Sequence, residues 1–175
     1  TRNNNTYTTR GIIITAYYNL MQGIGANNSY RGGLLNIEAA QFNSLGKRVM
    51  LGFNIQSQNL TGSQSPFYLL PTLGTDEMMR GFYNGRYRDR NLITGQAELR
   101  YRLSDRISIA GFTGAGTVFN KSFSASDLKP NYGGGLRYFF DVEKGLTIRA
   151  DYGFGQKVPD EERQSGFYLS LGEAF

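Results

Sequence analysis

The amino-acid sequence predicts an all-β fold: an antiparallel up-and-down transmembrane β-barrel, with eight strands from this chain. Apolar and polar side chains alternate along most of the sequence, and helical spacing is almost absent. The alternating segments exceed the ~5–6 residues of an ordinary soluble strand and approach the ~9–11 that cross a bilayer when tilted. Long and short connections also take turns along the chain, as they do in a membrane barrel.

Each strand is expected where the alternation is continuous. The 175 residues are too few for two independent domains, so residues 1–175 are assigned to one outer-membrane barrel domain. In chain order the expected strands are residues 11–22, 30–42, 48–58, 92–103, 107–119, 131–140, 146–155 and 166–175.

The first three segments differ in how clearly they alternate. The first carries Tyr18 on its apolar face, and the second is the weakest because Leu34 and Leu35 are adjacent. The third is the clearest, with Phe53 among apolar residues at every second position and Asn54 among the polar residues between them. A two-faced strand is the structure that such a pattern predicts.

The remaining segments repeat the pattern. Leu99 alternates with Glu98 in the fourth, and Ala150 alternates with Asp151 in the seventh. Short glycine runs occur in the fifth, sixth and seventh, at Gly114, Gly133 and Gly153. No helix is expected after them, so we interpret them as bends or small lumen positions and not as phosphate loops.

The connections predict which ends of the strands lie together. Residues 59–91 form the longest connection, whereas residues 104–106 and 141–145 are tight turns. In an outer-membrane barrel the short turns face the periplasm and the longer loops face outside. An even number of strands then places both termini on the short-turn rim.

The distribution of charge predicts which face points inward. The polar faces contain charges of both signs, which can pair inside a lumen, while the opposite faces are aliphatic with tyrosines suited to the bilayer interface. A lipocalin-like barrel would have an apolar lumen, and an antiparallel sandwich with charged faces in water remains the alternative. The expected lumen charges, besides Glu98, are Arg100, Arg102, Arg137, Arg149 and Asp151.

Composition narrows the classes of function. The chain has no cysteine and no histidine, which removes thiolate and imidazole metal sites and the usual nucleophile–base pairs. We therefore expect no metal, no cofactor and no enzymatic activity. The net charge of +5 is modest, and the arginine-rich stretch at residues 78–91 lacks the later aromatic positions of an RNA-binding strand. Nucleic acid is not expected as a partner; a solvated basic loop is the simple alternative.

The last strand ends in the pattern of an assembly signal. A final amphipathic strand that stops at an aromatic residue resembles the C-terminal signal of bacterial outer-membrane barrels. The apolar residues of this expected signal are Phe167, Leu169, Leu171 and Phe175.

Residues 73–103, "LGTDEMMRGFYNGRYRDRNLITGQAELRYRL", resemble the core signature of the bacterial surface antigen superfamily, the BamA- and TamA-like assembly barrels. Further similarity lies at residues 1–11, 116–119 and 166–175. In that family an apolar-Arg-Gly-aromatic tetrapeptide sits at the tip of a long loop folded back into the barrel. The resemblance assigns this motif to Met79, Arg80, Gly81 and Phe82.

The resemblance also implies an acidic partner for the loop arginine, and Glu98 matches it. We call the expected pairing of Arg80 with Glu98 the clamp. The family has a second acid at the position that Gly114 occupies here, so the clamp is expected to be weaker or to be completed by Glu38 or Asp151. A buried guanidinium favours such carboxylate partners because its planar fork binds them at two points.

The resemblance implies a non-enzymatic barrel in the bacterial outer membrane that inserts or moves client outer-membrane proteins across it. A weakly paired seam between the first strand, 11–22, and the last, 166–175, would open and offer an edge to a client strand. The alternative is a small structural or pore-like barrel without insertase activity.

The long loop raises a question of space. The interior of an eight-stranded barrel is just filled by side chains, and unpaired edges cannot face lipid. Three arrangements are therefore open. An N-terminal barrel half completes the wall, two copies join as a homodimer, or this chain closes alone with its loop outside.

Overall fold

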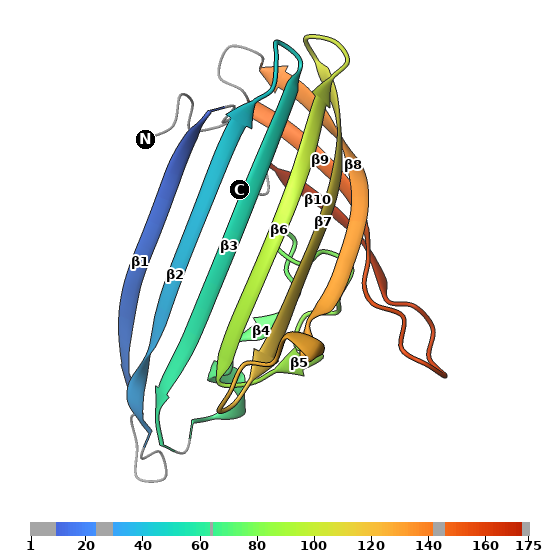
Figure 1. Ribbon diagram of the computed structural model, residues 1–175. Coiled ribbons are helices and arrows are strands. Elements are labelled where there is room, and N and C mark those ends of the chain that lie inside the picture. Colours follow the sequence, from blue (N-terminus) through green and yellow to red (C-terminus); the bar gives the residue numbers. More distant parts are fainter. Residues whose placement is uncertain (1–9, 24–29, 64, 142–145, 173–175) are drawn as a thin grey trace.

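The computed structural model describes residues 10–23, 30–63, 65–141 and 146–172. Its main feature is one eight-stranded antiparallel sheet in which neighbours in sequence are neighbours in space (Figure 1). The predicted up-and-down order is confirmed for these strands. They are β1 (Gly11–Gln22), β2 (Arg31–Ser44), β3 (Val49–Gly62), β6 (Asn91–Arg102), β7 (Ile107–Phe119), β8 (Lys129–Asp141), β9 (Leu146–Phe154) and β10 (Ser165–Leu171).

Strand boundaries follow the alternation closely. β1 and β7 begin and end at the predicted residues, while β3 continues to Gly62 beyond the predicted Gln58. β2 is a regular strand despite its weak pattern, because Phe42 and Ala40 add an apolar cluster with Met50 on the polar face of the sheet. The predicted end of the last strand includes residues 173–175, which lie outside the described residues.

The two faces of the sheet have opposite character. Phe53 and Leu169 on the convex face are 43% and 68% exposed, whereas Arg100 and Arg149 on the concave face are each 1% exposed. The convex face is therefore a continuous apolar surface, as the alternation predicts. Other large apolar residues on it are Ile14, Tyr18, Leu20, Ile37, Ile55, Leu99, Tyr101, Ile109, Tyr132, Leu136, Tyr138, Ile148, Tyr152, Phe167 and Leu171.

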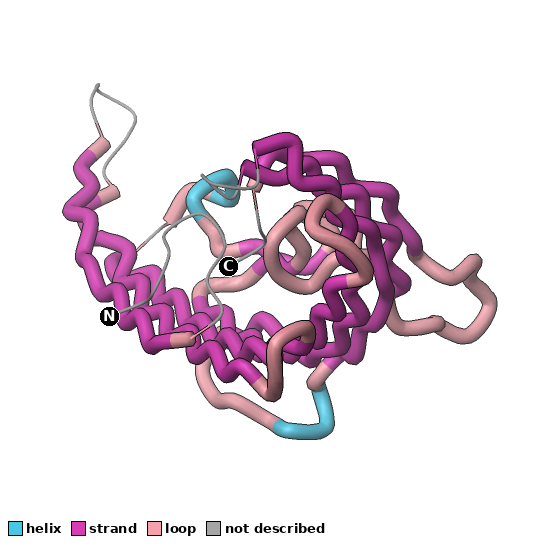
Figure 2. Tube along the Cα trace, turned by 90° about the horizontal axis from the view of Figure 1, so that it is seen from above, coloured by secondary structure: helices cyan, strands magenta, loops and turns pink. Residues whose placement is uncertain are grey.

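The predicted closed cylinder is wrong for the described residues. The strand order begins at β1 and ends at β10, and no strand pairing joins these two edges. Figure 2, viewed from above, shows the strands as an open curve with loop segments inside it. No helix in the described part of the chain is long and apolar enough to cross a membrane.

The long connection explains why the sheet stays open. Residues 65–90 fold back onto the concave side and contain η1 (Phe67–Leu69), β4 (Thr72–Leu73) and β5 (Tyr87–Arg88). They bury an apolar cluster of Leu73, Met79 and Phe82 against Leu92 of β6. A closed eight-stranded interior has no room for such a loop. The arrangement with the loop outside a self-closed barrel is thus contradicted. A second short helix, η2 (Ala125–Asp127), lies in the connection after β7.

Candidate functional site

The tip of the long connection is a tight turn pressed onto the concave face of the sheet. Met79 adopts a left-handed backbone with φ 57° and Gly81 follows with φ 106°. A Cβ at position 81 would lie 2.5 Å from the carbonyl carbon of Phe154, so only glycine fits there. The Gly81 N–H donates to the Tyr168 hydroxyl at 2.8 Å, which ties the turn to β10.

Arg80 extends from this turn into the centre of the concave face. Its guanidinium is fully buried and pairs with Glu98 of β6 at 2.5 Å and with Asp151 of β9. Its carbon centre lies 3.5 Å from the centroid of the Phe112 ring of β7. The Asn131 side chain of β8 donates to the Arg80 carbonyl at 2.9 Å. One residue of the loop therefore contacts four strands of the sheet.

Both acids are shared with arginines of the sheet. Glu98 accepts from Arg100 at 2.6 Å and from Arg137 at 3.2 Å. Asp151 accepts from Arg137 and lies 3.5 Å from Arg149. Carboxylates buried without partners would be strongly unfavourable, and each of these two has several cationic neighbours. Arg80 of the loop and the arginines of the sheet therefore form one network of ion pairs around Glu98 and Asp151.

The missing second acid of the family motif is replaced from another strand. The matching position, Gly114, has no room for a side chain, since a Cβ would lie 2.8 Å from Asn131 Oδ1 and 2.5 Å from the Gly95 carbonyl oxygen. Asp151 of β9 instead supplies the second carboxylate that contacts Arg80. Glu38, the other candidate, accepts a hydrogen bond from Asn54 at 2.8 Å.

Glycines of β8 and β9 make space for the turn. A Cβ at Gly153 would lie 2.6 Å from the carbonyl carbon of Arg80, and one at Gly133 would lie 2.4 Å from the Phe112 ring. These positions agree with the interpretation of the glycine runs as small positions on the inner face. Contacts of the turn with Phe112, Asn131 and Tyr168 could not be predicted from the sequence, because these residues are far apart in the chain.

The flanks of the turn are held by further contacts. Gln96 donates to the Glu77 carbonyl at 3.2 Å, and the Tyr83 N–H donates to the Gln164 side chain at 3.2 Å. Asp76 lies 3.4 Å from Arg149. Burial raises the pKa of the Glu77 carboxyl above its ordinary value, and the negative charge of Asp76 raises it further.

One expected lumen charge lies apart from the others. Arg102 is half-buried at the end of β6, where its guanidinium stacks 4.7 Å from the Phe139 ring. It donates to the carbonyls of Ser104 and Asp105 at 3.3 and 2.7 Å. Arg102 therefore belongs to the short-turn rim, because the strand has already reached the rim at this point.

The residues of the expected C-terminal signal lie on the convex face. Phe167, Leu169 and Leu171 are exposed there and pair with β9. Phe175 lies outside the described residues. The described residues contain no group of three or more acids that could hold a metal ion.

Comparisons with known proteins bear on this geometry. A family model described as the Omp85 superfamily domain matches residues 1–175. No curated protein matches the sequence. Among solved structures, the backbone structure of the Yersinia pestis outer membrane protein Ail in a phospholipid bilayer nanodisc is similar at 18% identity. That match covers 93% of this chain and 96% of that chain, with a TM-score of 0.42, which is too low to support an argument.

Removal of the Arg80 guanidinium should destabilise the fold. We expect Arg80→Ala to lower the free energy of unfolding by about 3 kcal/mol, since it breaks a buried ion pair on one side. The stability of Arg80→Lys should lie between those of the wild type and Arg80→Ala, because an ammonium group lacks the planar fork that bridges both carboxylates. Urea unfolding and heat-modified gel mobility measure the change.

Arg86→Ala is the matched control in the same loop, since Arg86 pairs with Glu161 at the surface. This variant should behave like the wild type. Equal unfolding curves for Arg80→Ala and the wild type would contradict the clamp.

Proposed function

The chain belongs to the Omp85 superfamily, and on that premise we propose that it forms part of a β-barrel wall in the bacterial outer membrane. The barrel takes part in the assembly or translocation of other outer-membrane proteins. The observation that carries this proposal is the combination of an apolar convex face with a charged loop buried on the concave face.

The convex face supports the membrane location. A monomeric soluble protein rarely exposes a large continuous apolar patch. Lipid-facing strands, in contrast, carry an apolar band edged by aromatic residues. Here Leu136 lies between Tyr132 and Tyr138 on β8, and all three are exposed. The same face would be unfavourable in water.

The two edges of the sheet support a role in handling other strands. β1 pairs with β2 and β10 pairs with β9, and the described residues include no other strand pairing for either. The backbone of an edge strand is a template on which an extended segment can add. A client strand adds at this seam, and no covalent chemistry is required.

The clamp supports the seam by fixing the curvature of the wall. Arg80 links β6 to β9 through Glu98 and Asp151, and the adjacent Gly81 reaches Tyr168 on β10. The last strand is thus attached to the loop by side-chain contacts, while its outer edge stays available. Opening of the seam then need not disrupt the buried ion pairs.

The wall must be completed by additional strands, because an open edge cannot face lipid. We propose that a second curved sheet supplies them, either from another copy of this chain or from a preceding barrel half. A copy related by a twofold axis along the barrel would bring β1 of one chain beside β10 of the other. These strands would then run antiparallel, as all neighbours in this sheet do.

A small structural or pore-like barrel is the alternative function. A porin-like lumen is filled with water. The loop with its buried ion pairs occupies the concave side here, which argues against a wide pore.

An arginine on the convex face should have a depth-dependent effect. Leu136→Arg, at the middle of β8, should lower stability in lipid vesicles by about 2–4 kcal/mol, because the charge would enter the hydrocarbon region. Ile107 is the first residue of β7, at the short-turn rim. Ile107→Arg should therefore have little effect on stability, because its charge would lie near the interface. Urea unfolding of vesicle-bound protein compares them. Small and equal losses of stability in the two variants would indicate that the convex face lies in water.

An insertion assay tests the assembly role. Vesicles that contain the full chain should fold an added outer-membrane barrel faster than empty vesicles, as followed by heat-modified mobility of the client. Vesicles with an unrelated small barrel are the control. No acceleration over this control, with the chain itself folded, would favour the structural or pore-like alternative.

Native mass spectrometry in detergent tests how the wall is completed. Two chains in each complex would support the second copy, since both edges of the sheet would then be paired. A single folded chain would exclude the homodimer and leave a preceding barrel half as the source of the missing strands.

A further inference from the structure

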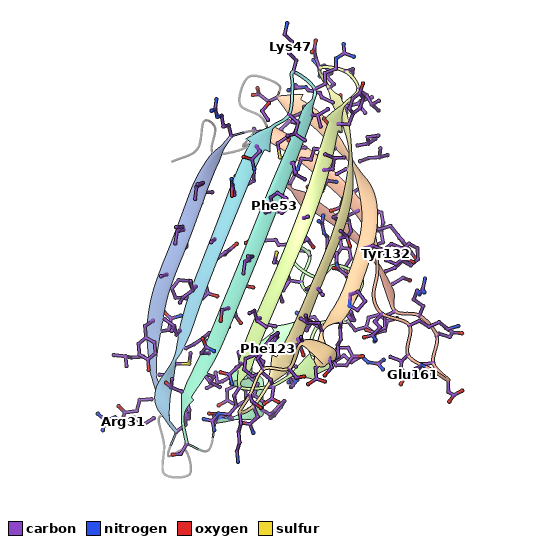
Figure 3. All side chains as sticks on the ribbon, viewed as in Figure 1. Arg31, Lys47, Phe53, Phe123, Tyr132 and Glu161 are labelled. Atoms are coloured by element: carbon purple, nitrogen blue, oxygen red, sulfur yellow. The ribbon has the colours of Figure 1, made fainter. Side chains whose placement is uncertain are left out.

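Two neighbouring turns on the short-turn rim gather positive charge that has no ion pair among the described residues. Residues 45–48 connect β2 to β3, and residues 103–106 connect β6 to β7. The turns lie side by side, since the Arg102 N–H donates to the Arg48 carbonyl at 2.8 Å. In Figure 3, Lys47 projects from this rim, while Arg31 lies at the opposite end of the strands.

The turns have hydrogen bonds that do not involve the side chains of Lys47, Arg48 or Arg106. Leu45 N–H donates to the Val49 carbonyl at 2.9 Å, and Leu103 N–H donates to the Ile107 carbonyl at 2.9 Å. The Ser44 hydroxyl donates to the Gly46 carbonyl at 2.8 Å. The exposed side chains of the turns are therefore available for binding.

Three cations of these turns are exposed and have no ion pair among the described residues: Lys47, Arg48 and Arg106. We call them the basic rim. Lys47 and Arg48 line two adjoining hollows of about 160 and 410 Å³ together with Arg102. Among the described residues, Asp105 is the one acid that lines either hollow. Positive charge is thus in excess where the two turns meet.

Apolar side chains accompany the basic rim. Leu45 is 61% exposed and Leu103 is 49% exposed, each within the same turn as the cations. Tyr101 and Tyr138 follow on the convex face, also exposed. Cations beside apolar and aromatic side chains are typical of the headgroup level of a bilayer, where tyrosines form a belt.

We propose that the basic rim binds the phosphate groups of anionic phospholipids in the leaflet that faces the short turns. The proposal rests on the membrane location given above. Leu45 and Leu103 enter the interface beside the acyl chains, and Lys47, Arg48 and Arg106 contact the phosphates. Exposed cations hold free phosphate weakly in water, whereas a charged lipid surface presents many phosphates within one Debye length. The structure therefore favours a lipid surface as the ligand.

The test compares lipid binding by the full chain and by two matched triple variants. Lys47→Gln/Arg48→Gln/Arg106→Gln removes the basic rim, and Arg31→Gln/Lys121→Gln/Lys157→Gln removes the same charge from the long-loop end. Native mass spectrometry in detergent measures adducts with phosphatidylglycerol and with phosphatidylcholine. The wild type should prefer phosphatidylglycerol, the rim variant should lose at least roughly tenfold in that affinity, and the control should keep it.

Several results would overturn the proposal. One is an unchanged phosphatidylglycerol affinity in the rim variant, and another is equal binding of both lipids by the wild type. Displacement of the lipid by millimolar inorganic phosphate would assign the site to the free ion. Heat-modified mobility checks that each variant folds, and Arg48→Glu alone gives a milder second variant with the same expected direction. Failure of the membrane location itself would appear separately, as a null effect of Leu136→Arg in vesicles.

Discussion

The ion pairs between Arg80 and the carboxylates of Glu98 and Asp151 are the constraint on which the rest of the structure depends. A guanidinium at 0% exposure is tolerated only where carboxylates and polar groups surround it, so the loop must reach one particular place on the concave face. Every neighbour of that place is adapted to the loop. Gly153 leaves room for the Arg80 backbone, Asn131 satisfies its carbonyl, and the Phe112 ring covers the guanidinium. The inner face is therefore shaped to fit this loop, and its two carboxylates match the charge of Arg80.

The shared carboxylates also explain why several arginines occur together on one sheet. Glu98 and Asp151 each contact more than one arginine, so the positive charges are held apart by negative ones across β6, β8 and β9. Such a network contributes little to net stability compared with a well-packed apolar core, because the desolvation of each charge opposes the attraction. Its effect is on geometry: a slip of one residue in any of these strands would turn a charged side chain toward the convex face. The network thus specifies the register of the sheet.

The sequence predicts most of the sheet and only part of the site, for physical reasons. Alternation is a local property, so β1 and β7 could be placed to the residue. It was weak in β2, where Leu34 and Leu35 are adjacent and Phe42 belongs to an apolar cluster on the inner face. The motif residue Arg80 and its neighbour Glu98 could be assigned by resemblance, but the choice of Asp151 over Glu38 depends on curvature, which places β9 near the loop and leaves Glu38 beside Asn54. The closed barrel was predicted because the unpaired backbone of an edge strand is unfavourable in contact with lipid. That argument concerns the finished assembly, and it does not say that one chain supplies every strand.

The position of the loop connects the ion pairs to the proposed function. A loop that fills the concave side requires a wall wider than eight strands can enclose, so β1 and β10 are kept apart and both retain an open edge. In a bilayer those edges must be paired, yet a pairing between separate sheets lacks the covalent connection that joins consecutive strands of this sheet. Under the proposed function we therefore expect the seam to open more easily than the rest of the wall. It lies beside β10, which the loop contacts through Tyr168. The buried arginine thus connects two features of the described sheet: the loop on its concave side and the open outer edges of β1 and β10.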